Sequence, residues 1–281
     1  MRIQHLDNAT APATIIRPTP GWAPINLREL WAYRELLYFL TWREIKVRYK
    51  QTLLGAAWAI IQPVFMMIVF TLFFGTLAKV PSEGIPYPLF NYAGLLPWTL
   101  FAEGITRSST SLVSNAALVQ KVYCPRLAMP LSGILSPIVD FALASVILLG
   151  LMFYFGYPPT VRMLWLPALT LLVLMTSLGV GLWLSAINTQ YRDVRHAVPF
   201  LIQLWLFASP VVYASTILPE RFRLIYGLNP MSGVIEGFRW AITGTEPPGY
   251  LMTVSIAIVI LLVISGAFYF RRQEKIFADV V

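Results

Sequence analysis

The sequence WREIKVRYKQTLLGAAWAIIQPVFMMIVFTLFFGTLA, residues Trp42–Ala78, joins a basic segment directly to a long apolar one. No charged residue occurs from Thr52 to Ala78. At about 1.5 Å per residue, a helix of this length crosses a hydrocarbon core of about 30 Å. The stretch therefore predicts a transmembrane helix, with its basic flank on the side from which the chain enters the membrane.

The composition extends this prediction to the whole chain. Of its 281 residues, 57% are hydrophobic and 12% are charged, whereas soluble domains carry about 25% charged residues. A polytopic, all-α membrane protein follows. One cysteine, Cys124, excludes an intrachain disulfide, and only two histidines leave no metal-ligand cluster. Residues 1–26 are proline-rich without an apolar signal region, which predicts a mobile tail.

Residues 27–51 predict an amphipathic helix that lies in the membrane interface. On a helical wheel, Arg28, Glu35, Arg43, Lys46 and Lys50 fall within a sector of roughly 80°, opposite a face rich in leucine and aromatic residues. Arg34 and Arg48 lie on the apolar side, so each needs either room to snorkel or an anionic partner.

Apolar windows of about 20 residues predict six spans within a membrane domain of residues 52–270. They are Thr52–Ala78, Tyr92–Val113, Leu131–Phe155, Leu164–Ile187, Ala197–Tyr213 and Tyr250–Phe270. Fifteen of the 21 lysines and arginines fall on the side of the N-terminus and five on the other, which predicts that both termini, including the tail 271–281, are cytoplasmic. The net charge of +8 then mostly reflects the basic residues that orient the chain in the membrane, and we expect no nucleic-acid partner.

Two connections contain more structure than a plain loop. The cytoplasmic segment 114–130 holds a short helical core at Asn115–Tyr123 that Pro125 terminates. The outer segment 214–249 holds two apolar pieces, Phe222–Leu228 and Met231–Ile242, that are too short to span and too apolar for a solvated loop. Two short re-entrant helices before the last span satisfy both conditions.

Three charged residues occur within the predicted spans. An ionised Asp140 near the middle of the third span costs at least ~2.5–3.5 kcal/mol unless it is paired, faces the bundle or is protonated. Glu103 and Arg107 stand four residues apart on the second span, where a mutual ion pair is favoured over the alternative of a substrate contact.

Four motifs in order resemble the permease subunit of bacterial ABC-2 type polysaccharide exporters, the O-antigen, teichoic acid and capsule group. They are REIKVRY with LGAAWAIIQP in Arg43–Pro63, GLLPW at Gly94–Trp98, YRDV at Tyr191–Val194, and SPVVY, ILP and NPM between Ser209 and Met231. The resemblance covers about Leu27 to Phe277 and is strongest to the O-antigen branch. It implies a homodimer in the bacterial inner membrane that moves an undecaprenyl-pyrophosphate-linked polysaccharide outward.

The same resemblance implies two cytoplasmic ATPase subunits, which would bind ATP and magnesium. This sequence contains no Walker A pattern and no protease or hydrolase motif, so we expect a transport subunit without catalytic residues, cofactor or metal. An ABC-2 permease for small hydrophobic drugs or lipids is the alternative function. A membrane-embedded transferase is a third, but only Asp193 and His196 lie near each other on the cytoplasmic side, which is little for catalysis.

The resemblance also assigns candidate roles. The basic helix corresponds to the interfacial gate helix, whose cations would meet the lipid pyrophosphate unless they are only positive-inside anchors: Arg34, Arg43, Lys46, Arg48 and Lys50. The contact with the ATPase is expected at Asn115, Leu118, Val119, Lys121, Val122, Tyr123 and Arg126, with a smaller one at Tyr191, Arg192 and Asp193. The extracellular gate is expected to include Glu220, Arg221, Arg223, Glu236 and Arg239.

Aromatic side chains are candidates for the lining of a glycan channel, because their faces bind the CH faces of sugars without deep traps. The set comprises Trp58, Phe65, Phe70, Phe73, Phe74, Trp98, Phe101, Trp205, Phe207 and Tyr213. For any single member, a position facing lipid is the stronger interpretation.

Overall fold

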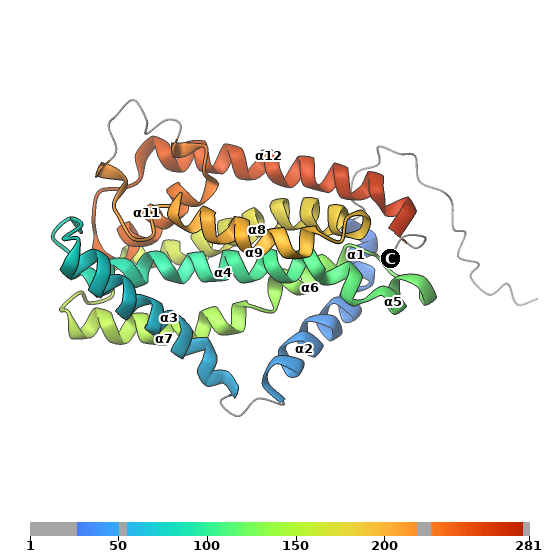
Figure 1. The fold of residues 1–281 in the computed structure, drawn as a ribbon, viewed down its shortest axis with the longest axis horizontal. Helices are drawn as coiled ribbons and strands as arrows, with labels where there is room; N and C mark the ends of the chain where they lie inside the picture. The colour runs from blue at the N-terminus through green and yellow to red at the C-terminus, as the bar shows by residue number, and fades with distance from the viewer. Residues whose placement is uncertain (1–26, 51–54, 218–225, 278–281) are drawn as a thin grey trace, which may run out of the picture.

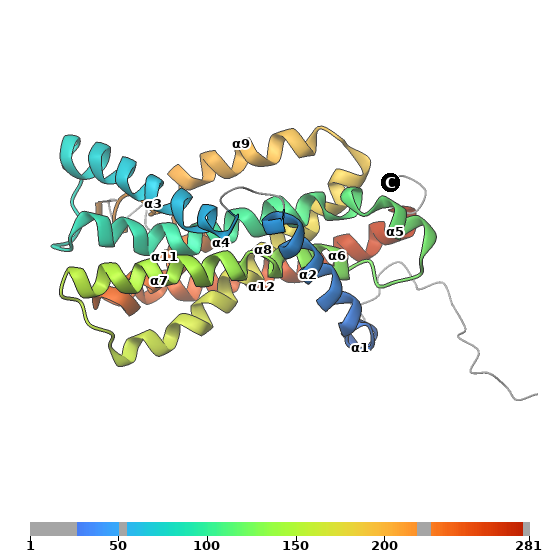
Figure 2. The same ribbon diagram turned by 90° about the horizontal axis from the view of Figure 1, so that it is seen from below.

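The computed structural model describes residues 27–50, 55–217 and 226–277, and these residues form an all-helical bundle without strands. This confirms the predicted all-α class. Figure 1 shows the long helices running side by side along one axis, and Figure 2 shows α9 separated to one side of them. The predicted tail 1–26 lies outside the described residues, as do residues 51–54 and 278–281.

The basic N-terminal segment forms two helices, α1 (Leu27–Ala32) and α2 (Arg34–Lys50), where the sequence predicted one. They are nearly continuous, because the amides of Tyr33 and Leu37 bridge the break to the carbonyls of Glu29 and Tyr33 at 3.1 and 3.2 Å. Leu40 on α2 is buried, whereas Tyr38 and Phe39 are exposed. The helix therefore packs one face on the bundle and presents aromatic side chains outward.

Four helical stretches are long and apolar enough to cross a membrane: Gly55–Leu77, Ala128–Tyr154, Val161–Gln190 and Gly249–Gln273. They correspond to the first, third, fourth and sixth predicted spans. The second predicted span falls in α4 (Tyr87–Ser114), which is longer than three of these stretches but less apolar than all four, and the fifth falls in α9 (Val194–Phe207), which is short.

The four stretches are not uniform helices. The first contains α3 (Trp58–Phe70) and continues as a π-helix over Thr71–Leu77. The next is broken between α6 (Ala128–Leu135) and α7 (Ile138–Tyr154), where Pro137 has no amide hydrogen to donate. The helix α8 (Leu166–Gln190) follows a short 3-10 turn, and α12 (Gly249–Gln273) precedes another.

Two further helices complete the described part. The helix α5 (Ala116–Lys121) occupies the predicted helical core of the 114–130 segment. The helix α11 (Pro230–Thr243) covers the second predicted outer piece. Its ends follow from the sequence, because the Asn229 side chain accepts from the Met231 amide at 3.1 Å, Pro230 takes the first turn, and Gly244 has a φ of 77° after the last turn.

The helix α4 runs through the centre of the bundle (Figure 1), and all of its residues from 89 to 98 are buried. Because protein surrounds it, its composition is not set by contact with lipid. Its second half can therefore carry Glu103, Arg107 and a run of serine and threonine residues.

The helices α8 and α12 approach each other closely at two glycines. A Cβ atom added to Gly266 would lie 2.5 Å from the carbonyl oxygen of Gly179. One turn away, the rings of Trp183 and Tyr269 stack at 4.1 Å, and the Trp183 indole donates to Ser265 at 3.2 Å. Small residues at such a crossing let the backbones meet, which is the usual basis of helix packing in membranes.

A second, smaller apolar core lies at the end of the bundle where α5 sits. It joins Leu40 of α2, Val119 of α5 and Met129 of α6 to Phe270 near the end of α12 and to Phe277 after it. Phe277 is fully buried and meets Phe270 edge-on at 5.2 Å. The segment after α12 is therefore part of the folded bundle up to Phe277.

The glycine crossing predicts a specific effect of a single methyl group. Gly266→Ala should lower the free energy of unfolding by about 1–3 kcal/mol, because the α8 backbone must move to avoid the new Cβ atom. Gly150→Ala on α7 is the matched control, since nothing lies within 4 Å of its added Cβ, and it should be neutral or slightly stabilising. Thermal unfolding of the purified protein in detergent compares the two, and equal midpoints would contradict the close packing.

Candidate functional site

One face of α2 carries cations along an apolar groove. A cavity of about 560 Å³ follows this helix. Its lining residues are Leu36, Phe39, Leu40, Trp42, Arg43, Lys46, Val47 and Lys50 of α2, with Leu118 of α5. The Lys46 ammonium lies 5.5 Å from the centre of the Trp42 ring, and Arg43 donates to the side chain of Asn115. An apolar groove with cations along it suits an amphiphile with an anionic head group.

The five cations predicted as one set are separated by the structure. Arg43, Lys46 and Lys50 share the groove. Arg34 lies earlier on α2, where its guanidinium donates to the Trp31 carbonyl at 3.4 Å and lies 5.9 Å from the Trp31 ring. Arg48 points to a different face of the helix and contacts the bundle.

Arg48 is held between two carboxylates from two other helices. Its guanidinium forms ion pairs with Asp140 of α7 and, at 2.8 Å, with Glu103 of α4. The hydroxyl of Tyr49 donates to the same Asp140. The anionic partner that the sequence required for Arg48 is therefore supplied by the protein, and Asp140 has the ion pair that its place in a predicted span calls for.

The ion pairs continue along α4. Arg107 donates to Glu103 at 3.1 Å, which confirms the predicted pair, and it also lies 3.7 Å from Glu44 of α2. Burial raises the pKa of the Glu44 carboxyl, and the nearby Arg43 and Arg48 oppose that shift. Sequence analysis did not single out Glu44. Its signal was an acid within the basic run 43–50, four residues before the misplaced Arg48.

These ion pairs border a second cavity, of about 460 Å³, enclosed by the end of α2, the start of α3, α4 and α7. Arg48, Glu103 and Asp140 line it together with Trp58, Trp98 and the amide of Gln62. The end of α2 and the start of α3 lie near each other at one edge of the bundle (Figure 1).

The candidate aromatic residues fall into groups by burial. Trp58, Phe65, Phe73 and Phe207 are at least half exposed, on α3, the π-helical stretch and α9. Phe74, Trp205 and Tyr213 are partly buried. Phe70, Trp98 and Phe101 are buried within the single chain, where Phe101 meets Trp205 edge-on at 5.0 Å.

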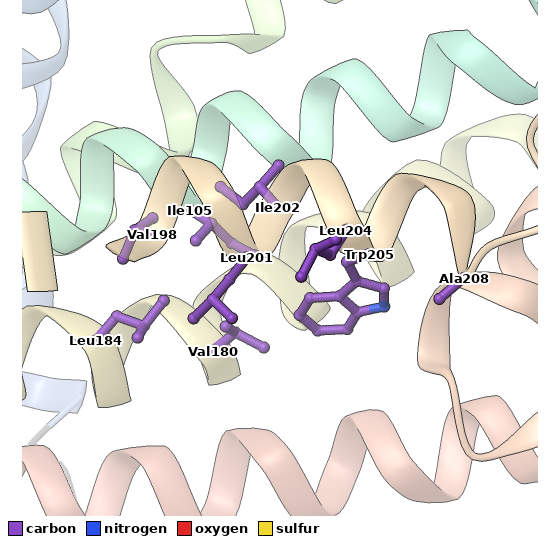
Figure 3. A pocket seen from close by; sticks show the side chains of 9 residues that line it. All are labelled: Ile105, Val180, Leu184, Val198, Leu201, Ile202, Leu204, Trp205 and Ala208. Carbon is purple, nitrogen blue, oxygen red and sulfur yellow. The ribbon is translucent and has the colours of Figure 1, made fainter. Parts of the chain in front are cut away.

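Trp205 borders a third hollow, of about 420 Å³, between α9 and α8. Figure 3 shows aliphatic side chains around it, with the indole of Trp205 at one end. That indole donates to Asn229 at 2.9 Å, so its polar atom already has a partner. The hollow thus offers apolar contact and little to bind hydroxyl groups.

The candidate ATPase-contact residues lie together at one end of the bundle. Val122 and Tyr123 are exposed, whereas Val119 is buried in the second core and Asn115 accepts from Arg43. Arg126 donates to the carbonyl of Glu274, which ties this segment to the end of α12. Tyr191, Arg192 and Asp193, between α8 and α9, are also exposed. The remaining candidates are Leu118, beside the groove, and Lys121, which is exposed.

At the opposite end, Arg239 of α11 is fully buried. Its guanidinium donates to the carbonyls of Phe90, Val211 and Tyr213 at 3.3, 2.7 and 3.3 Å, and lies 3.6 Å from the centre of the Phe90 ring. Glu236 lies 3.5 Å from it and accepts from the amide of Ser215 at 3.1 Å. Arg239 thus joins α11, α4 and the 208–217 turn. The other predicted outer-gate residues, Glu220, Arg221 and Arg223, lie outside the described residues.

Comparison with known proteins identifies the family. A family model described as ABC-2 type transporter matches residues 35–243. The chain belongs to the ABC-2 type transporter family. This ABC-2 permease is 34% identical over 256 residues to the O-antigen export system permease protein RfbA of Myxococcus xanthus, covering 88% of this chain and 96% of that protein.

Two further relatives are less similar. A Klebsiella pneumoniae protein of the same name is 29% identical over 249 residues, with 88% of this chain and 95% of that protein covered. The polysialic acid transport protein KpsM of Escherichia coli is 23% identical over 239 residues, with 83% and 91% covered. The predicted family and its O-antigen branch are thereby confirmed. The apolar helices and these permease relatives indicate an inner-membrane transport subunit.

The buried Arg239 guanidinium acts as a brace between α11, α4 and the 208–217 turn, and its contribution to stability can be tested. Arg239→Ala should lower the free energy of unfolding by about 3–5 kcal/mol, because three carbonyls lose their donor and Glu236 loses its ion pair. Arg239→Lys should also destabilise, since one ammonium cannot reach three carbonyls in the fork geometry of a guanidinium. Thermal unfolding in detergent measures both, and Arg28→Ala, at an exposed arginine, is the control. An Arg239→Ala midpoint equal to that of the control would contradict the brace.

Proposed function

We propose that this permease forms the membrane channel of an ATP-driven exporter for a polysaccharide linked to a lipid pyrophosphate, with O-antigen as the substrate class. The observation that carries the proposal is the cation-lined apolar groove on α2, in a chain similar over nearly its full length to proteins named O-antigen export permeases. An amphiphile with a pyrophosphate head and a polyprenyl tail matches both parts of such a groove.

The proposed assembly is a homodimer with two cytoplasmic ATPase subunits that bind ATP and Mg²⁺. The absence of a Walker A sequence from this chain supports a separate ATPase. In this arrangement α4 and α9 join the four apolar stretches as spans, α11 belongs to a re-entrant pair, and both termini are cytoplasmic. The exposed α5 and 191–193 residues then face the ATPase.

The glycan would pass between the two subunits. The exposed aromatic residues on α3, the π-helical stretch and α9, Trp58, Phe65, Phe73 and Phe207, support this route, because they are available to a partner or a sugar chain. The buried Phe70, Trp98 and Phe101 would support the wall from behind. The outer end around Arg239 would close the channel. This is the end at which the sequence predicts the extracellular gate.

Deletion of the gene tests the function. Cells without it should lose surface polysaccharide and accumulate the lipid-linked glycan at the inner leaflet, and the complete chain should restore export only together with an active ATPase. Replacing the Walker A lysine of that ATPase should abolish the rescue. Surface polysaccharide that persists in the deletion strain would refute the proposal, and loss of drug or lipid efflux instead would favour the alternative ABC-2 function.

The groove makes a quantitative prediction. The double variant Lys46→Gln and Lys50→Gln should raise the apparent KM for the lipid-linked glycan about 30-fold, because each cation near the head group contributes about 1 kcal/mol. Transport into proteoliposomes with the ATPase present measures the KM. Lys275→Gln, an exposed lysine outside the groove, should leave it unchanged. If the double variant transports normally but inserts poorly, the cations act only as topology anchors.

A further inference from the structure

The two halves of α2 are attached to the bundle by different forces. Leu36, Leu37 and Leu40 in the first half belong to the second apolar core. The described α2 residues after Leu40 contribute to neither apolar core. The second half is joined instead by polar contacts. Glu44, Arg48 and Tyr49 meet charged groups of α4 and α7, and Arg43 donates to Asn115 at the end of α4.

These contacts form a continuous chain of alternating charge. It runs from Asp140 to Arg48, Glu103, Arg107 and Glu44, and so passes from α7 to α2, along α4 and back to α2. Tyr49 adds a neutral hydrogen bond to the first carboxylate. Except for the Glu103–Arg107 pair within α4, each link depends on the position of α2, and removal of Arg48 leaves two carboxylates without this cation.

The charges of these ion pairs also indicate which ligands the ion-pair series does not bind. Three carboxylates and two guanidinium groups give it a formal charge of −1. A phosphate that approached Arg48 in this conformation would meet Asp140 and Glu103 as well, and like charges at short range repel. The cations suited to phosphate are Arg43, Lys46 and Lys50 in the groove. Arg48 therefore differs from them in function as well as in position.

The ion-pair series also borders a cavity. Arg48, Glu103 and Asp140 line the 460 Å³ cavity that the end of α2 and the start of α3 enclose together. If the second half of α2 moved away from α4 and α7, this cavity would open along the seam that α2 forms with these two helices. Apolar packing holds the first half of α2 in place, so the motion would be a hinge near Leu40.

We propose that the Arg48 ion pairs with Asp140 and Glu103 form a reversible latch that holds the second half of α2 closed, with Asp140 as the positioning residue. Opening the cavity requires Arg48 to leave both carboxylates. Ion pairs suit this task because each closed arrangement is discrete, and the released groups are stabilised by water that enters the opened seam. The latch rests on the proposed function only in taking the opened seam as the entrance for substrate.

A distance measurement on the permease–ATPase complex tests the latch. Spin labels at Val47 of α2 and Val146 of α7, both exposed, report the separation of the two helices in a Cys124→Ala background. Without nucleotide or substrate, the reference protein should give one short distance within each subunit, and singly labelled proteins identify the distances between the two subunits. Asp140→Asn and Glu103→Gln should each add a longer, open population, whereas Glu246→Gln, an exposed acid, should not. Distance distributions unchanged by both test variants would overturn the proposal.

Exchange of the charges separates a latch from a general loss of folding. In a Glu103→Gln background, Arg48→Asp alone should lengthen the distance between α2 and α7. Addition of Asp140→Arg should restore the short distance. A double exchange that stays open, or that does not assemble with the ATPase, would overturn the latch. Asp140→Glu should stay closed by the same measure. Because these distances are recorded without substrate, they stand or fall independently of the deletion experiment that tests the exporter function.

Discussion

A charged side chain at membrane depth must find its counter-charge within the protein, and this requirement fixes how the helices of this permease meet. Asp140 cannot face lipid as an ion without a large cost, and neither can Glu103 or Arg107, which also lie in predicted spans. Their ion pairs bring α2, α4 and α7 to one place. The position of α2, and with it the cavity between α2 and α3, follows from that junction.

The same helix therefore carries two kinds of charge with opposite purposes. Arg43, Lys46 and Lys50 remain along an apolar groove, where an anionic head group can reach them. Arg48 is already neutralised by carboxylates. If the proposed head group binds in this groove, the helix that receives it is the helix held by the Arg48 ion pairs, so no long-range relay is needed between the two sets of charges.

Much of the fold could be predicted from local signals. Long apolar runs, prolines and the Asn229-Pro230 pair at the start of α11 predict where helices lie, because these features act within one or two turns. The division of the five cations could not be predicted, because it depends on which face of α2 meets the bundle. Arg43 and Arg48 are five residues apart, which turns them by about 140° around a helix. Glu44 was missed for the same reason, since its partner Arg107 lies on a distant segment.

The breaks in the predicted spans have local causes that a hydropathy window averages away. Pro137 divides α6 from α7, and α9 ends at Phe207 because Pro210 follows, short of the predicted end at Tyr213. The burial of α4 is a property of its neighbours. A hydropathy window therefore ranks α4 below the four apolar stretches, although α4 lies at the centre of the bundle.

The burial of Phe277 bears on how the molecule is made. The second core takes its other members from α2, α4, α5, α6, α8 and α12, all of which precede Phe277 in the chain. During synthesis, those segments are inserted while this core still lacks its last side chain. Its hydrophobic face stays open until α12 has left the ribosome and the translocon. The end of the bundle that carries α5 is thus completed last, so a permease whose synthesis stops early lacks a finished surface there.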